Sequence, residues 1–430
     1  MTQQRISVDY LARVEGETGL EIYAKDGRIE RVELDIFEPP RFFEGFLVGR
    51  KFDEVPDLVA RICGICPTPH KLTAIKAIER AFRIEPSAQT RALRRLLALS
   101  QWIQSHVLHV YMLAAPDYLG YESAIAMAAN SDLKPVVERA LRLKRLANDL
   151  TTLVGGREVH PITPVVNGFS SLPDKDALAV MRKRLVEGIP ECETTARLVA
   201  SFKLPGFTRK CEHVALRNDD SYPLNEGRLV STEGLDVTDE SYKDVILESH
   251  VPHSNAKHAK IEGRDSFLVG PLARVNLNFD KLSPRARSLA AEVGFDFPSF
   301  NPFMNAAARA LEILNSVEEC IDIIDGLELK PEDTRFEVKA GKGFAVTEAA
   351  RGICCHGYEI DSNGIVQKAD IVAPTARNAY NIEKDFYEYA PSVLHLPQDE
   401  ATLRCEMLIR AYDPCFSCSV HFLDLRIHKD

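Results

Sequence analysis

Two Cys-x-x-Cys pairs near opposite ends of the chain constrain its fold more than any other feature. Cys63 and Cys66 stand in the segment RICGICPTPH, and Cys415 and Cys418 stand in DPCFSCSVH. This spacing lets two sulfur atoms converge on one metal ion. Structural zinc sites usually draw their ligands from within roughly a few tens of residues, whereas most of the 430-residue chain separates these pairs. If both pairs bind one metal, that metal lies at the centre of the fold.

Four thiolate ligands are compatible with several kinds of site. A structural zinc site uses four thiolates, nickel also accepts soft sulfur ligands, and a redox dithiol needs only one pair. Pro67, directly after Cys66, is typical of the first turn of a helix, so a helix is expected to begin there. The spacing alone leaves zinc, nickel and redox chemistry open.

The composition excludes other classes of protein. Hydrophobic residues make up 45% and charged residues 27% of the chain, enough to fill a core, and the net charge of −10 argues against a nucleic-acid partner. The apolar runs are too short for a membrane span, and the first residues lack the apolar core of an export signal, so a cytoplasmic location is expected. The ten cysteines are expected to be thiols rather than disulfides.

Hydrophobic patterning predicts strands at both ends of the chain and long helices between them. The fold class is α+β, predominantly α, with long central helices around a buried metal site and small peripheral sheets. We expect one interlocked domain over 1–430. Strands and one cysteine pair are expected at each end, in 1–70 and in 337–421. Core helices are expected in 85–156 and 300–325, and strands and irregular chain in 160–275. The first long helix is expected to begin at Ser87 and end at Pro116, and its arginines Arg91, Arg94 and Arg95 to form a solvated face.

The two cysteine segments together resemble the two signature motifs of nickel–iron hydrogenase large subunits. Arg61, His70, Asp413 and His421 complete the match around the cysteines, and the resemblance covers nearly the whole chain. It is most similar to the cytoplasmic, bidirectional, multisubunit branch (group 3). The resemblance implies a buried bimetallic site that reversibly cleaves H2 into protons and electrons. It also implies carbon monoxide and cyanide ligands on the iron.

The resemblance assigns the ligands and the acid–base residues. All four cysteines would bind nickel, with Cys66 and Cys418 also bridging to iron. Cys415 would take a proton from H2, and Glu15 would relay it. Further residues implied by the resemblance are Arg351 over the open metal position, Asp117 as the acidic partner of that arginine, and Ala373, Pro374 and Thr375 around the diatomic ligands of the iron. Ala350 stands where the family commonly has proline, which leaves the rigidity of the backbone before Arg351 open.

A second metal site and several partners are also implied by the resemblance. Glu44, His421 and the carbonyl of Ile371 match a site for magnesium, or iron. Residues 422–430 match a C-terminal extension that a maturation protease removes after nickel chaperones deliver the metal. Electrons would pass to a small subunit with 4Fe–4S clusters, and then through diaphorase or other electron-transfer subunits to NAD(P) or a deazaflavin.

Two alternatives and several histidines and cysteines complete the interpretation. A non-hydrogenase homologue resembling complex I would lack the nickel cysteines, and a non-catalytic scaffold would bind structural zinc. His106 and His109 are expected to pack or to hydrogen-bond toward a partner subunit, and His250, His253 and His258 are given no ligand role. The other cysteines are expected to be fillers or surface thiols: Cys192, Cys211, Cys320, Cys354, Cys355 and Cys405.

Overall fold

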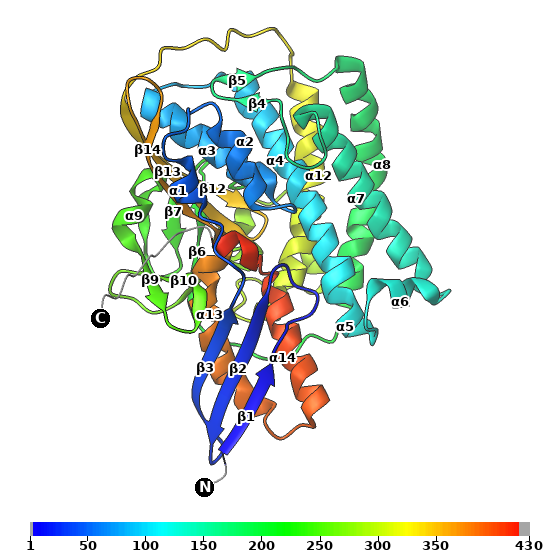
Figure 1. The fold of residues 1–430 in the computed structure, drawn as a ribbon. Helices are drawn as coiled ribbons and strands as arrows, with labels where there is room; N and C mark the ends of the chain where they lie inside the picture. The colour runs from blue at the N-terminus through cyan, green and yellow to red at the C-terminus, as the bar shows by residue number, and fades with distance from the viewer. Residues whose placement is uncertain (1–2, 421–430) are drawn as a thin grey trace, which may run out of the picture.

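The computed structural model describes residues 3–420. Four long helices lie side by side on one side of the molecule, and small sheets lie around them (Figure 1). These helices are α4 (Ala88–Leu108), α7 (Lys134–Gly155), α8 (Lys175–Ala200) and α12 (Asn305–Gly326). The α+β class and its helical predominance, predicted from the sequence, are confirmed.

The first long helix begins where the sequence predicts, but it does not end where the sequence predicts. The Ser87 hydroxyl accepts a hydrogen bond from the Thr90 N–H at 2.9 Å and caps α4, as expected. The prediction that Pro116 ends this helix is wrong. The chain continues through a π-helical turn (His109–Ala114) into α5 (Ala115–Leu119), where Pro116 lies in the first turn and its missing N–H costs no hydrogen bond.

Helix α8 was missed, because residues 160–275 were predicted as strands and irregular chain. It is 26 residues long, and the Asp174 carboxylate caps it by accepting from the Ala177 N–H at 2.8 Å. Pro190 lies inside the helix, and proline is usually a helix breaker. Burial against the neighbouring helices stabilises α8 despite that local signal.

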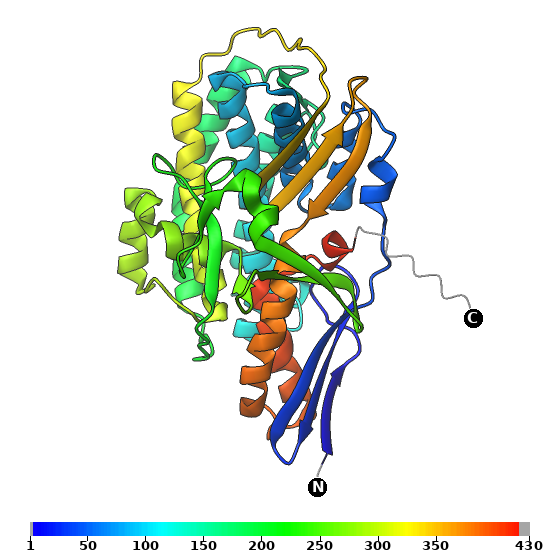
Figure 2. The same cartoon turned by 90° about the vertical axis from the view of Figure 1, so that its left-hand side faces the viewer.

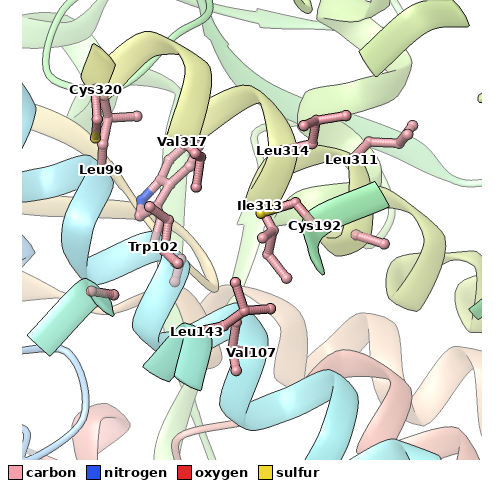
Figure 3. Close-up of a cluster of buried hydrophobic side chains, with 14 of the residues drawn as sticks. Leu99, Trp102, Val107, Leu143, Cys192, Leu311, Ile313, Leu314, Val317 and Cys320 are labelled. Carbon is pink, nitrogen blue, oxygen red and sulfur yellow. The ribbon is translucent and has the colours of Figure 1, made fainter. Parts of the chain in front are cut away.

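The core of the helical bundle is built from apolar faces that meet between the four helices (Figure 3). Trp102 of α4 lies beside Val317 of α12, Leu99 lies beside Cys320, and all four side chains are buried. Cys192 and Cys320 are buried in the same cluster, as expected for cysteines that fill space. Burial raises the pKa of the Cys320 thiol well above its usual range, so this group stays a neutral thiol.

Of the three arginines of α4 that were expected to form a solvated face, Arg91 is exposed but Arg94 and Arg95 are not. Arg94 is buried, and its guanidinium donates two hydrogen bonds, of 2.8 and 2.6 Å, to the Glu79 carboxylate on α3 (Pro67–Phe82). Arg95 is partly buried and pairs with Glu319 of α12. These pairs dock α4 onto its neighbours, and the prediction is wrong for both residues because their partners are distant in sequence.

Strands form at both ends of the chain, as predicted. β1 (Gln3–Val8), β2 (Thr18–Lys25) and β3 (Arg28–Ile36) make an antiparallel sheet that turns at Asp26-Gly27. A second antiparallel sheet holds β12 (Gly341–Ala349), β13 (Gly352–Ile360) and β14 (Val366–Val372). Two further sheets contain β6 (Glu212–Arg217), β7 (Arg228–Ser231), β8 (Asp236–Thr238), β11 (Phe267–Leu268), β9 (Ile246–Val251) and β10 (Ser254–Ile261).

Shorter helices complete the fold. They are α1 (Phe43–Leu47), α2 (Val55–Val59), α6 (Ala124–Ala129), α9 (Tyr242–Val245), α10 (Pro271–Asn278), α11 (Pro284–Val293), α13 (Pro374–Tyr389) and α14 (Gln398–Tyr412). Within residues 3–420, no helix has both the length and the apolar character needed to cross a membrane.

The two ends of the chain meet in the middle of the molecule. Figure 2 shows the last described turn next to the loop that follows the N-terminal strands. Glu15 and Cys415 pair as an isolated parallel bridge, and the Arg41 N–H donates to the Val420 carbonyl at 2.8 Å. This arrangement brings the two Cys-x-x-Cys segments together.

Candidate metal centre

The four cysteines of the two motifs form one buried group. The Sγ atoms of Cys63 and Cys415 lie 3.5 Å apart, those of Cys66 and Cys418 3.8 Å apart, and those of Cys415 and Cys418 2.7 Å apart. All four sulfur atoms lie within 4.8 Å of one another. The structure therefore satisfies the central requirement of the sequence hypothesis, that sulfurs from both ends share one pocket.

Local backbone structure directs these sulfur atoms inward. Cys66 is the N-cap of α3, with Pro67 in the first turn, as predicted. The N–H groups of Ile65 and Cys66 point at the Cys63 sulfur, at 3.3 and 3.0 Å. At the other end, a short 3-10 turn (Phe416–Ser419) carries Cys418 back over Cys415. Both segments thus present their sulfurs to one cradle, and backbone donors are aimed at the Cys63 sulfur.

The ionisation of these thiols indicates that the site suits a cation. Burial opposes the charge on the Cys63 sulfur, but the neighbouring thiols donate to it and lower its pKa well below the usual range. Burial and the neighbouring sulfurs raise the pKa of Cys415 and Cys418 well above it. Four buried thiols this close cannot all ionise unless positive charge is added, so a soft divalent metal fits the donor set.

Glu15 lies directly against the second cysteine pair. Its Oε2 atom is 3.0 Å from the Cys415 sulfur and accepts the Ser417 N–H at 3.2 Å, while its Oε1 accepts from the Ser417 hydroxyl. The next residue, Gly16, has a φ of +90°, and a Cβ there would lie 2.7 Å from the Ser417 nitrogen. Only glycine allows this close approach, which fixes the glutamate beside the sulfur.

Arg351 lies near the cysteine group but does not pair with Asp117. Its guanidinium donates to the Asp413 carbonyl at 2.7 Å and to the Asp413 carboxylate at 2.9 Å. Asp117 instead accepts from Arg410, at 2.8 and 3.0 Å, and from Arg13. The implied pairing with Asp117 is therefore corrected to Asp413, which stands two residues before Cys415 and could have been proposed from that adjacency.

The groups around Arg351 keep its guanidinium protonated. Burial would lower its pKa, but the neighbouring Asp413 carboxylate and the cysteine sulfurs close by raise that pKa well above its usual range. Its Nη1 atom is buried and has no hydrogen-bond partner among residues 3–420. A permanently charged donor beside the sulfur cradle is thus free to bind an anionic group.

Sequence reasoning missed Arg274, which holds the backbone immediately before Arg351. This fully buried guanidinium donates to the carbonyls of Ala349 and Ala350, at 2.8 and 3.0 Å. Its charge is balanced by Glu312, at 2.7 and 2.8 Å, and by Glu348 at 3.0 Å. The two carbonyl contacts supply the rigidity that was left open by the alanine at position 350.

Replacing Arg274 by methionine is expected to destabilise the fold by about 3–5 kcal/mol, because Glu312 and Glu348 would be left buried without a counter-charge. The free energy of unfolding from denaturant titration measures this. Arg285→Met is the matched control, since Arg285 is half exposed and its ion pairs should contribute at most about 1 kcal/mol. Equal losses in the two variants would contradict the role given to Arg274.

The segment Ala373, Pro374 and Thr375 lies at the cysteine group. Ala373 is packed in the same buried cluster as all four sulfurs and caps α13, whose first turn contains Pro374. The Thr375 hydroxyl oxygen accepts the Cys415 N–H at 2.9 Å, which leaves its own hydrogen available to donate. The structure thus brings this segment to the sulfurs.

The residues of the second site are brought together only in part. Glu44 of α1 accepts the Ile371 N–H at 2.8 Å, so these two residues meet through the N–H of Ile371, whereas its carbonyl was the expected ligand. Burial raises the pKa of Glu44 to about 7. His421 and the extension 422–430 lie outside the described residues.

Other histidines and cysteines hydrogen-bond within the chain. His106 contacts Glu312 at 2.8 Å, and His109 contacts the Arg410 carbonyl at 2.7 Å, so both serve internal packing rather than a partner subunit. His70 contacts His356 at 3.1 Å, with Cys354 3.7 Å from His70. Burial lowers the pKa of His70 to about 4.

Comparison with known proteins agrees with this geometry. The model of the family described as nickel-dependent hydrogenase matches residues 41–138 and 233–421, which include all four cysteines. The chain therefore belongs to the nickel-dependent hydrogenase family. It is an oxidoreductase that activates H2, as the sequence resemblance implied.

Several similar proteins are subunits of multisubunit enzymes. The chain is 38% identical to the alpha subunit of sulfhydrogenase 1 from Pyrococcus furiosus, over 98% of each chain. It is 29% identical to a subunit of the F420-non-reducing hydrogenase of Methanothermobacter thermautotrophicus, over 98% of this chain and 95% of that one. A solved NAD+-reducing [NiFe]-hydrogenase matches with a TM-score of 0.86 at 26% identity, over 97% of this chain and 99% of that one.

Proposed function

We propose that Cys63, Cys66, Cys415 and Cys418 hold a nickel–iron centre, with Cys66 and Cys418 bridging the metals and carbon monoxide and cyanide bound to the iron. The observation that carries this proposal is the convergence of four buried sulfurs within 4.8 Å of one another. When bound, the metals supply the Lewis acidity and the redox capacity that heterolytic cleavage of H2 requires.

The protein supplies the base and the first step of proton transfer. The Cys415 sulfur takes the proton, and the Glu15 carboxylate at 3.0 Å receives it from the sulfur. The Ser417 N–H and hydroxyl hold that carboxylate in place. A relay residue must lie within hydrogen-bond reach of the group that it deprotonates, and Glu15 meets this condition without movement.

The diatomic ligands would be held by donors from two sides. The unpaired Nη1 of Arg351 and the free hydrogen of the Thr375 hydroxyl both belong to residues that contact the second cysteine segment. Charged and hydroxyl donors suit the nitrogen of a cyanide ligand. Ala373 and Pro374 add an apolar wall there.

The electrons leave through a partner. We propose a small subunit with 4Fe–4S clusters and further electron-transfer subunits that reduce NAD(P) or a deazaflavin. The names of relatives as alpha subunits and the fold of the NAD+-reducing enzyme support this arrangement. A maturation protease acting on residues 422–430 and nickel chaperones remain part of the proposal.

A second metal, magnesium or iron, would bind Glu44 with Ile371 and His421. Because burial raises the pKa of Glu44 to about 7, a cation must displace a proton at lower pH. The affinity for Mg2+ is expected to fall about tenfold for each pH unit below about 7 and to level off above it. Calorimetric titration between about pH 5.5 and 8.5 measures this slope. Glu44→Gln should weaken binding and flatten the slope, and an unchanged slope in that variant would exclude Glu44 as the ligand.

Metal analysis combined with infrared spectroscopy tests the proposed centre. Protein matured in its own host should contain nickel as well as iron, and should show absorption from metal-bound carbon monoxide and cyanide. Zinc in place of nickel, without those bands, would reject the nickel–iron centre and restore the structural-zinc alternative.

A further inference from the structure

Two histidines and a glutamate meet on the side of the molecule formed by β9, β10 and α13. His253 lies in the turn between β9 and β10, His258 lies in β10, and Glu383 lies in α13. One ligand atom from each residue lies within 4.8 Å of the other two. The sequence separation of Glu383 from the hairpin hid this group from sequence analysis, which gave both histidines no ligand role.

The distances suit a small divalent ion. The His253 Nε2 atom is 2.7 Å from Glu383 Oε1, and the His258 Nδ1 atom is 3.7 Å from Glu383 Oε2. In a tetrahedral zinc site with bonds of about 2.0–2.1 Å, neighbouring ligand atoms are about 3.3 Å apart. The two contacts reach different oxygens of the Glu383 carboxylate, and each differs from this spacing by less than about 1 Å. The two histidines lie within the same 4.8 Å limit.

His258 belongs to the group without a hydrogen bond to Glu383. Its side chain is only 4% exposed, and 3.7 Å is too long for a hydrogen bond to Glu383. Its Nε2 atom is buried without a partner among residues 3–420.

The surroundings of the group favour positive charge. The carboxylates of Glu33 and Asp35 lie near His253 and add negative charge beside the group. The Leu34 N–H donates to Glu383 Oε1 at 3.0 Å and orients that carboxylate. The His253 side chain is 23% exposed, which leaves one side of the group open to water and to entering ions.

We propose that His253, His258 and Glu383 bind one divalent transition-metal ion of the zinc class, with water in the fourth position. The ion ties the β9–β10 hairpin to α13, the helix whose first turn carries Thr375 at the cysteine group. This site goes beyond the proposed hydrogenase centre, because its ligands are nitrogen and oxygen and it supplies no reacting group.

Zinc K-edge X-ray absorption of the purified, matured hydrogenase complex tests the site. The complex is stripped with a chelator, dialysed against a small excess of Zn2+ and freed of unbound ion. About one zinc per chain is expected, with a shell of nitrogen and oxygen at about 2.0 Å. Sulfur at about 2.3 Å would instead place the zinc on the four cysteines and count against the nickel–iron centre, so the two proposals fail separately.

The variants Glu383→Gln and His253→Gln are expected to lower zinc affinity at least about tenfold. His395→Gln, which removes an exposed histidine outside the group, should leave it unchanged. Nickel content and infrared bands equal to those of the wild type show that each variant has folded. The proposal is overturned if stripped wild-type complex takes up no nitrogen- and oxygen-bound zinc, or if both ligand variants retain wild-type affinity.

Discussion

Cys415→Ala is expected to abolish hydrogen turnover and to release nickel from the protein. The sulfur lies 3.5 Å from that of Cys63 and 2.7 Å from that of Cys418, so its removal leaves three thiolates around one open side. The same sulfur lies against Glu15, and its loss also removes the proton acceptor. Loss of general-base chemistry alone lowers rates by about 10²–10⁴-fold, and loss of a metal ligand adds to that. H2 uptake with an artificial acceptor and nickel content by mass spectrometry measure both effects.

Cys405→Ala is the matched control. Cys405 is a buried cysteine of α14 in the same part of the chain, but it lies outside the four-sulfur group. It should keep its nickel and its turnover and lose at most about 1 kcal/mol of stability, as for a small buried truncation. If Cys415→Ala keeps wild-type nickel and activity, the proposed ligand set is wrong.

The sequence motifs predicted the cysteine group because its chemistry is concentrated in short segments. Thiolate ligands come only from cysteine, so two Cys-x-x-Cys pairs indicate such a site directly. Pro67 likewise indicated the start of α3. The resemblance placed Glu15 as well, and the structure adds its reason, a glycine at position 16 that lets the loop approach Ser417. Features that depend on local residue types could therefore be predicted from the sequence.

Features that depend on long-range packing could not be predicted from the sequence. Arg274 and Glu312 belong to helices with ordinary apolar patterns, and nothing local shows that their charges meet in the core. Asp117 was paired with the wrong arginine because the pairing rested on motif position alone, whereas the fold places Arg410 beside it. Helix α8 was missed because Pro190 lowers the helix propensity of its segment, whereas burial against neighbouring helices stabilises it in the fold.

The charge pattern of α4 shows the same limit. Arg94 looked like a surface residue in a basic run, yet the fold buries it against Glu79. A lone buried charge is expensive, so such a residue is found inside only with its partner, and a partner on another helix cannot be recognised from one segment.

Glu15→Gln is expected to block proton transfer while it leaves the metal centre intact. The amide has the shape of the carboxylate: its oxygen can still accept from the Ser417 N–H, and its NH2 group can donate to the Ser417 hydroxyl oxygen. It cannot take a proton from the Cys415 sulfur at 3.0 Å. Turnover should fall by about 10²–10⁴-fold, the usual contribution of a positioned acid–base group. Exchange between D2 and solvent protons should fall with it.

The infrared spectrum distinguishes a relay from a structural role. In Glu15→Gln the bands of the metal-bound diatomic ligands and the nickel content should match those of the wild type, because no ligand is altered. Glu17→Gln, two residues along the chain and outside the sulfur group, should change neither exchange nor turnover. Full exchange in Glu15→Gln would mean that protons leave the Cys415 sulfur by another route. Lost nickel would instead mean that the Glu15 side chain supports the cysteine segment through its hydrogen bonds with Ser417, rather than relaying the proton.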